Sequence, residues 1–256
     1  MKKLLYAVAA IVVSLSAVSC SEETKSTSVE PMNIEFWEVC DYSVAIELTN
    51  FFYCGSADAL VREGLAESGA TTFTSLSSLI IPEYPSIVYN GNVVSTPVGY
   101  NCILAADASN INLISEYLEL EPVKEELDRI TGGSVKLAWS YKNSLGEAGD
   151  GIYILYALQG SGGMYPAMDG SCVVEAKAAK GQFGGYEVSI VFNDEAAKEF
   201  EFVTIRNIGR HLAIVGNGKV LSLPVVNGRI DGGHVTISGD FDKQEAEALA
   251  KAINAK

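Results

Sequence analysis

The stretch that decides the fold spans residues 188–254 and reads VSIVFNDEAAKEFEFVTIRNIGRHLAIVGNGKVLSLPVVNGRIDGGHVTISGDFDKQEAEALAKAIN. It opens with a short alternating strand, and Asn193 is placed to cap a helix that has Asp194 and Glu195 in its first turn. Acidic side chains in that position favour a helix start. Gly209 is placed to end this helix, whose apolar face is predicted on Ala197, Phe200, Thr204 and Ile208.

The remainder of the stretch predicts three strands and a second helix. Residues 212–215 have the composition of a buried strand, and the turn at 216–218 leads back into a strand over 219–223. A second turn at 227–228 and the pair Gly232-Gly233 precede an alternating strand over 234–238. Asp242 and Glu245 have capping-box spacing, and the final helix has one apolar stripe, made of Ala246, Leu249, Ala250 and Ile253. This β-α-β-β-β-α order indicates an α+β fold.

The same residues resemble a known family, the head of the first periplasmic domain of SecD and fused SecDF. That family has an asparagine-led helix, a T-x-x-N-[IV]-G turn, an L-A-I-V strand, a G-K-V hairpin, a G-G pair and an I-[ST]-G segment. The matching positions here are Thr204, Asn207, Ile208, Gly209, 212–215, Gly218, Lys219, Val220, Pro224, Gly232, Gly233, Ile237, Ser238 and Gly239. The resemblance implies a ferredoxin-like head, with an antiparallel sheet and helices on one face.

Weaker similarity extends over nearly all of residues 33–256, through SEYLELEPVKEEL, VKLAWSYK, IYILYALQ and MDGSCVVEAKA. The membrane helices and the base subdomain of the family have no counterpart in this reading. Because proton-coupled pulling needs charged groups inside the membrane, we expect a stand-alone head-like domain without motor activity.

The N-terminus predicts export and lipidation. Lys2 and Lys3 precede the apolar residues 4–15, and residues 17–20 (AVSC) resemble a bacterial lipobox. We therefore expect a lipoprotein signal peptide over 1–19 and acyl chains, palmitate among them, on Cys20; the alternative is an ordinary secretory signal. Residues 20–32 have the polar composition of a flexible tether. The head-like domain follows over 33–256, as an N-terminal part (33–131) and a core α+β part (132–256).

The N-terminal part predicts a strand at 34–39 and a helix containing Val44, Leu48, Phe51 and Phe52, although a strand also fits. Ser56 is a candidate cap for a helix over 57–67, and residues 69–101 have the composition of an irregular insertion. A short strand at 100–104 and two helices follow; the second has Pro122 in its first turn, an apolar face predicted on Val123, Leu127 and Ile130, and its end at Gly132. A hairpin then joins 135–141 to 151–159, with an inner face predicted on Val135, Leu137, Trp139 and Tyr141.

Charge excludes one class of partner. The formal net charge is −14, and −16 once Lys2 and Lys3 are removed with the signal. Such a protein repels phosphate backbones, so nucleic-acid binding is not expected.

Besides Cys20 the chain has an even number of cysteines, at Cys40, Cys54, Cys102 and Cys172. In an exported chain this permits two disulfides, and the short loop between Cys40 and Cys54 makes that pair the expected one. The alternative is buried or free thiols. The spacings match no zinc pattern, so neither a metal nor a cofactor is predicted.

Catalytic patterns are absent from the sequence. The two histidines, His211 and His234, lie at strand ends, and no G-x-S-x-G motif accompanies them. The acidic pairs 125–126 and 194–195 fit helix surfaces, and the glycine-rich segments 160–163 and 181–185 lack phosphate-binding spacing. The sequence therefore indicates no enzyme.

Two functions remain. In the first, a lipid-anchored relative of the SecD head binds exported polypeptides or Sec translocase components, for example by adding a client segment to an exposed strand edge. In the second, a structural or cell-surface lipoprotein has kept the fold without a transport role. We expect the outer membrane, facing the periplasm, with surface display as the alternative.

Overall fold

The computed structural model describes residues 29–81, 86–89, 92–95, 102–142, 151–160, 164–181 and 184–255. The predicted signal peptide, Cys20 and most of the predicted tether lie outside these residues. The elements of the first part of the chain are β1 (Ile34–Val39), α1 (Tyr42–Tyr53), α2 (Ser56–Glu67), η1 (Leu76–Ser78), β2 (Ser86–Tyr89), β3 (Asn92–Ser95), β4 (Cys102–Asp107), α3 (Ile111–Leu118), α4 (Glu121–Thr131), β5 (Val135–Trp139) and β6 (Ile152–Gln159). Those of the second part are β7 (Met168–Asp169), η3 (Gly170–Cys172), β8 (Val173–Lys180), β9 (Tyr186–Phe192), α5 (Asp194–Arg206), β10 (Leu212–Gly216), β11 (Lys219–Ser222), β12 (His234–Phe241) and α6 (Lys243–Asn254).

The larger sheet combines strands from both parts of the chain. Its order is β11-β10-β1-β6-β4, with β5 paired to β6 and β7 paired to β1. The register of β1 against β10 runs from Ile34↔Gly216 to Glu38↔Leu212. Alternation sends Ile34 and Phe36 to one face of the sheet, and Trp37 and Val39 to the other. Both faces of β1 are therefore buried, which explains why its sequence does not alternate between apolar and polar residues.

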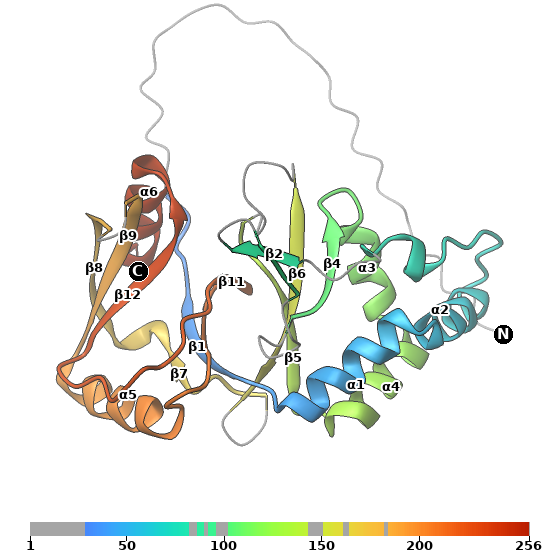
Figure 1. Cartoon of the computed structure of the whole chain (residues 1–256), viewed down its shortest axis with the longest axis horizontal. Helices are drawn as coiled ribbons and strands as arrows, with labels where there is room; N and C mark the ends of the chain where they lie inside the picture. Colours follow the sequence, from blue (N-terminus) through green and yellow to red (C-terminus); the bar gives the residue numbers. More distant parts are fainter. Residues whose placement is uncertain are drawn as a thin grey trace, which may run out of the picture.

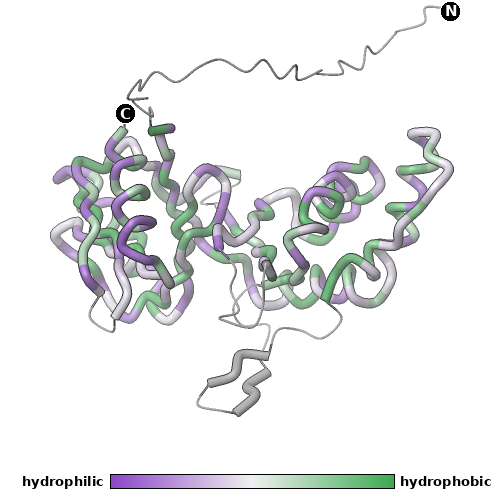
Figure 2. Tube along the Cα trace, turned by 90° about the horizontal axis from the view of Figure 1, so that it is seen from above, coloured by the Kyte–Doolittle hydropathy of each residue, from purple (hydrophilic) through white to green (hydrophobic). Residues whose placement is uncertain are grey.

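Helices α1 to α4 pack on the face of β4, β5 and β6 and form with them what we call the N-terminal unit (Figure 1). Their shared core contains Leu48, Phe52, Leu104, Ile114 and Leu155, each at most 1% exposed. The predicted face of α4 is confirmed, because Val123, Leu127 and Ile130 are all buried. Hydrophobic and hydrophilic residues alternate along the helices, as expected for helices with one buried face (Figure 2).

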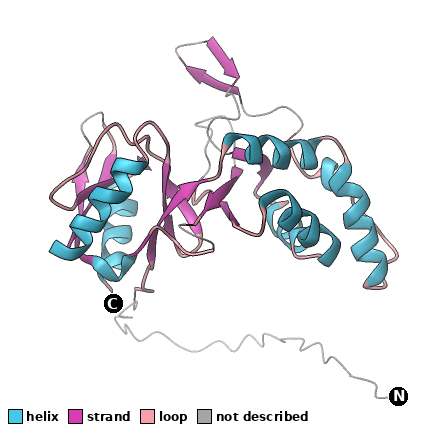
Figure 3. Ribbon diagram, turned by 90° about the horizontal axis from the view of Figure 1, so that it is seen from below, coloured by secondary structure: helices cyan, strands magenta, loops and turns pink. Residues whose placement is uncertain are grey.

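The C-terminal unit consists of the sheet β12-β9-β8 with α5 and α6 on one of its faces (Figures 1 and 3). Phe36 of β1 enters the core of this unit, where its ring centroid lies 5.4 Å from that of Phe192 and 5.3 Å from that of Phe200. The predicted α+β architecture, an antiparallel sheet with helices on one face, is confirmed. Strands β1 and β10 lie between the two units: one face belongs to the core of the C-terminal unit, and the other packs against Ala138 of β5 and Leu158 of β6.

Both predicted helix starts in the C-terminal unit are confirmed. The side chain of Asn193 accepts a hydrogen bond from the Ala196 amide (2.9 Å). Asp242 accepts from the Glu245 amide and Glu245 accepts from the Asp242 amide, both at 2.8 Å, so the capping box is formed. The predicted face of α5 needs correction: its buried residues are Ala196, Phe200, Val203 and Thr204. Ile208 is 54% exposed, because the helix already ends at Arg206.

Strands β1, β10, β11, β5 and β6 form a circuit of neighbours around a small apolar core. The Tyr141 amide donates to the Val220 carbonyl (2.8 Å) and closes the circuit between the end of β5 and β11. The enclosed side chains are Trp37, Val39, Ala138, Leu158, Ala213, Val215 and Val220. Lys136 lies on this side of β5, with its Nζ 3.0 Å from Glu35 Oε2 and 4.6 Å from the centroid of the Trp37 ring.

Three other expectations differ from the structure. Ser56 is the first residue of α2 and not its cap; the N-cap is Gly55, whose φ of 81° suits glycine. The predicted irregular insertion contains the hairpin β2–β3, and its residues Leu76 and Ile80 are buried in the N-terminal unit. The strand predicted at 100–104 runs instead from Cys102 to Asp107 as β4.

Candidate functional site

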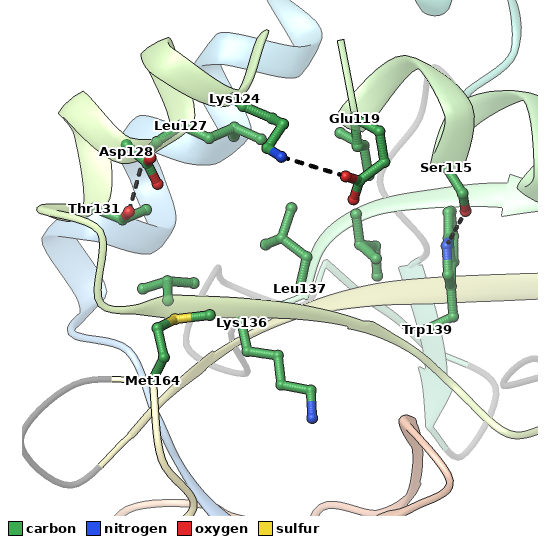
Figure 4. A pocket seen from close by; sticks show the side chains of 13 residues that line it. Ser115, Glu119, Lys124, Leu127, Asp128, Thr131, Lys136, Leu137, Trp139 and Met164 are labelled. Carbon is green, nitrogen blue, oxygen red and sulfur yellow. Dashed lines mark hydrogen bonds and ion pairs between the residues drawn. The ribbon is translucent and has the colours of Figure 1, made fainter. Parts of the chain in front are cut away.

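An open groove of about 370 Å³ lies between β5 and the helices α3 and α4 (Figure 4). This volume is within the range of ligand-binding clefts. The groove is lined by the apolar side chains of Leu118, Leu127, Val135, Leu137, Trp139, Leu155 and Met164, and by Ser115, Glu119, Lys124, Asp128, Thr131 and Lys136.

The alternation of β5 creates the groove. Leu137 and Trp139 point toward α3 and α4, whereas Lys136 points away from the helices (Figure 4). The sequence predicted Val135, Leu137, Trp139 and Tyr141 as a buried inner face. The first three are only half-buried and Tyr141 is 37% exposed, because α3 and α4 cover this face incompletely. The uncovered part of the apolar face is the floor of the groove.

The polar groups at the groove either form hydrogen bonds with one another or lie at its rim. The indole Nε1 of Trp139 donates to Ser115 Oγ (3.0 Å), and that hydroxyl donates to the Ile111 carbonyl (2.7 Å). At the rim, Lys124 Nζ lies 3.5 Å from Glu119 Oε2, and both side chains are largely exposed. A groove with an apolar floor and a charged rim is suited to binding apolar side chains of a ligand. Within the described residues, no group of three or more His, Cys, Asp or Glu side chains could hold a metal ion.

Two of the motif residues, Thr204 and Asn207, join elements of the C-terminal unit to each other and to β1. Thr204 is fully buried; its hydroxyl donates to the Glu201 carbonyl (3.0 Å) and accepts from the Ile230 amide (3.1 Å). Asn207 is 1% exposed, and its Nδ2 donates to the Val203 carbonyl (2.8 Å) and to Glu38 Oε1 (3.1 Å). Both residues therefore act as buried polar anchors.

The remaining motif residues shape turns and close approaches. Asn217 (φ 47°) and Gly218 (φ 79°) make the tight turn between β10 and β11, which leaves Lys219 exposed. The Gly209 amide donates to the Val226 carbonyl (2.8 Å), and the Leu212 amide donates to the Pro224 carbonyl (3.1 Å). Three glycines lie around β12: Gly232, Gly233 and Gly239. The motif thus builds the scaffold of the C-terminal unit.

A second cavity of about 460 Å³ lies beside this scaffold. Its walls come from α5, from the start of β12, from the faces of β1 and β10, and from the segment 224–230. Thr204, Leu212, Ile214 and Pro224 are the motif residues that line it. This cavity was not predicted, because its walls come from five separate segments of the chain.

The expected disulfide is wrong in this structure: no bond joins any pair among Cys40, Cys54, Cys102 and Cys172. The 12 residues of α1 separate Cys40 from Cys54. A helix of that length spans about 18 Å, whereas a disulfide needs Cα atoms within about 7 Å. Cys40 and Cys102 are buried, Cys172 is half-buried and Cys54 is exposed. Burial, and next the Asp41 carboxylate, raise the pKa of the Cys40 thiol to about 12.

The histidines and acidic pairs lie in separate places. The ring Nδ1 of His211 lies 3.0 Å from the Leu223 carbonyl, and His234 is exposed at the start of β12. Arg129 Nε donates to Glu126 Oε2 (2.8 Å), and this hydrogen bond lowers the pKa of the Glu126 carboxyl. Asp194 and Glu195 lie in the first turn of α5, as predicted.

An exposed apolar stripe on α5 was not predicted. Phe202, Ile205 and Ile208 are 68%, 44% and 54% exposed, and Val225 nearby is 41% exposed. The spacing of three residues places the first three on one side of the helix and its C-terminal turn. That spacing was visible in the sequence, but the assignment of Ile208 to the core concealed it.

Comparisons with known proteins give one family for the C-terminal unit. Residues 161–256 match the family model of the SecDF P1 head subdomain. The protein translocase subunit SecDF of Thermus thermophilus is 41% identical over 88 residues, which are 34% of this chain and 12% of that protein. The protein translocase subunit SecD of Rhodothermus marinus is 25% identical over 255 residues, which are 95% of this chain and 39% of that protein.

The chain therefore spans well under half the length of either relative. A solved structure described as "a membrane component SecDF that enhances protein export" has 22% sequence identity and a TM-score of 0.36, with 87% of this chain and 93% of that chain covered.

Proposed function

We propose that this protein is a non-catalytic binding module related to the protein-export machinery, because residues 161–256 match the family model of the SecDF P1 head subdomain. It binds exported polypeptides or components of the Sec translocase. In this proposal the acylated Cys20 holds it on the outer membrane, facing the periplasm, as the lipobox-like residues 17–20 suggest. No helix of the described residues is long and apolar enough to cross a membrane.

The observation that carries the proposal is the groove between β5 and the helices α3 and α4. Its floor offers half-buried Leu137 and Trp139, while exposed Met164 (51%) lies at its margin. Apolar surface left open to water is characteristic of sites that bind other molecules. Unfolded polypeptides present apolar side chains without a core to bury them, so they match such a groove chemically.

In-cell photo-crosslinking tests the proposal directly. A photoreactive amino acid is placed at Met164 and Glu119 in the groove and at Lys219 in the β10–β11 turn. A matched control position is Val174, which is 61% exposed on β8 and lines neither cavity. We expect adducts with translocase subunits or exported chains from the groove and not from Val174. If the folded protein gives neither adduct at any position, the proposal fails and an independent structural or cell-surface lipoprotein remains.

The lipid anchor has its own test. The variant Cys20→Ser should move from the membrane fraction to the soluble fraction, and it should lose incorporation of a labelled palmitate analogue. Protease treatment of intact cells then separates the two faces of the outer membrane: a protein facing the periplasm is protected. Unchanged membrane retention of Cys20→Ser would overturn the anchor.

A further inference from the structure

Strand β5 has hydrogen-bonded strand pairing on one side only. It pairs with β6 from Val135↔Gln159 to Trp139↔Leu155. In this ladder the Ser140 amide donates to the Ile154 carbonyl (2.8 Å). Because the backbone groups of an antiparallel strand point alternately to its two sides, those of Lys136 and Ala138 face β6 as well. The N–H and C=O groups of Val135, Leu137 and Trp139 therefore point to the opposite side.

That outer side of β5 is left open because β11 begins only at Lys219. Strand β11 pairs with the chain only at the C-terminal end of β5, through the parallel bridge Ser140↔Val220 and the hydrogen bond that the Tyr141 amide donates to the Val220 carbonyl. In a parallel arrangement, residues before Ser140 lie level with residues before Val220, where β11 gives way to the turn at Asn217 and Gly218. Over the described residues, the outward backbone groups of Val135 and Leu137 have no partner strand, whereas Trp139 lies next to the bridge to Val220.

The open edge is not protected by charge. Proteins commonly guard an edge strand with a lysine whose ammonium stays in solvent. Lys136 is the single charged residue of β5, and it points to the other face, where it pairs with Glu35 (3.0 Å) and stacks on Trp37. Beside the groove lies one exposed apolar side chain, Met164 (51%).

The edge and the groove are two parts of one surface. An added strand beside β5 would direct every second side chain to the face that carries Leu137 and Trp139, hence into the groove (Figure 4). Such a strand needs apolar residues at alternate positions. Its backbone would satisfy the outward groups of β5, which gives affinity without requiring a particular sequence.

The charge around the groove favours a positively charged ligand. The helices α3 and α4 with their connection, residues 111–131, carry acidic side chains at Glu116, Glu119, Glu121, Glu125, Glu126 and Asp128, against basic ones at Lys124 and Arg129. Most of these acids are exposed. A ligand rich in Lys or Arg is therefore attracted, whereas an acidic one, including a second copy of this chain with its net charge of −14, is repelled.

We propose, as a refinement that rests on the proposed function, that the outer edge of β5 binds an extended, positively charged polypeptide segment as an additional strand, with alternate apolar side chains in the groove. The ligand is recognised by backbone pairing at Val135 and Leu137, by apolar contact with Leu137 and Trp139, and by the net negative charge of residues 111–131.

The probe is the fluorescent peptide Lys-Lys-Val-Ser-Val-Ser-Val-Lys-Lys, whose alternate valines can enter the groove while the lysines at its two ends can approach the acidic side chains of residues 111–131; its twin has Glu in place of every Lys. Binding is measured by fluorescence anisotropy with the full mature chain. We expect the basic peptide to bind at least about tenfold more tightly than the acidic twin, with a difference that falls as salt is added. Equal binding of the two peptides, or no binding of the basic one, overturns the inference.

The variant Leu137→Pro tests the edge. It removes an outward N–H without disturbing the ladder to β6, since proline is tolerated on an edge whose N–H faces solvent. Leu137→Ala is the matched control, because it removes the same side chain but keeps the N–H. We expect Leu137→Pro to bind the basic peptide at least about tenfold more weakly than Leu137→Ala. Equal affinities of the two variants contradict strand addition.

Hydrogen exchange of the unmodified protein gives a second measurement, which does not depend on a variant that folds. The basic peptide should slow exchange of the Val135 and Leu137 amides and leave the amides of β8 unchanged. Protection confined to another edge, or a dimer seen by analytical ultracentrifugation that protects β5 without peptide, would refute the proposed ligand. The two proposals fail independently. Crosslinks to exported chains without peptide binding at β5 would contradict only the strand addition. Peptide binding at β5 without such crosslinks would contradict only the proposed function.

Discussion

Lys142 Nζ lies 2.5 Å from Glu245 Oε2, although the two residues belong to different units of the protein. The same ammonium lies 5.2 Å from the centroid of the Phe241 ring. Glu245 also completes the capping box of α6, so its carboxylate serves the helix start and the contact between units together. Lys142 thus links the residues that follow β5 to the start of α6.

This contact predicts a measurable contribution to stability. Lys142→Met should lower the free energy of unfolding by about 1 kcal/mol, the sum expected for a partly buried ion pair and a cation–π contact. Lys243→Met is the matched control, because Lys243 pairs with Glu247 at 3.7 Å and both side chains are mostly exposed. It should change stability by less than about 0.5 kcal/mol. Urea unfolding measures both, and equal losses would show that the contact between units adds nothing.

The buried hydroxyl of Thr204 predicts a local effect. Thr204→Val keeps the side-chain volume but removes the acceptor of the Ile230 amide, so we expect a loss of about 1–2 kcal/mol. Thr204→Ser keeps the hydroxyl and serves as control. Hydrogen exchange distinguishes the two: the Ile230 amide should lose protection in the valine variant and retain it in the serine variant. Retained protection in both would mean that the hydrogen bond to Thr204 is dispensable.

The local signals of the sequence identified the C-terminal helices well. Asn193 caps α5 and the box of Asp242 and Glu245 starts α6, because a cap acts on amides only two or three residues away. The turn at Asn217 and Gly218 was equally visible, since positive φ values favour these two residue types.

Long-range pairing could not be read in the same way. The sequence suggested that all strands of residues 188–254 belong to one unit, yet β10 and β11 join the larger sheet through β1. The contact that fixes this register, from the Asn33 amide to Asn217 Oδ1 (2.9 Å), joins residues 184 positions apart. No periodicity within β10 reports such a partner. For the same reason, the alternation of β5 showed an apolar face but not that α3 and α4 leave part of it open.

The raised pKa of Cys40 predicts a dependence of stability on pH. Its folded-state pKa of about 12 lies above the pKa of 9.0 expected for a thiol in the unfolded chain. The unfolded state therefore releases this proton first, and the stabilisation, full below pH 9, is lost as pH rises toward 12. Between pH 9 and 11 under reducing conditions, the wild type should lose up to about 1.4 kcal/mol per pH unit more than Cys40→Ala does. Parallel curves for the two proteins would contradict the burial of a neutral thiol.

The pair Gly232 and Gly233 predicts unequal costs for the same substitution. Both have positive φ, 84° and 68°, so alanine at either position adds backbone strain of about 1–2 kcal/mol. A Cβ at Gly232 would meet nothing within 4 Å, whereas one at Gly233 would lie 2.7 Å from the Cβ of Ala197 on α5. Because β12 and α5 must then move apart, Gly233→Ala should cost about 1–3 kcal/mol more than Gly232→Ala in urea unfolding. The double variant Gly233→Ala/Ala197→Gly removes the clash and should recover part of this difference, although glycine in α5 itself costs about 1 kcal/mol. If the two single variants are equally stable, the close approach of β12 to α5 does not explain why glycine is needed at position 233.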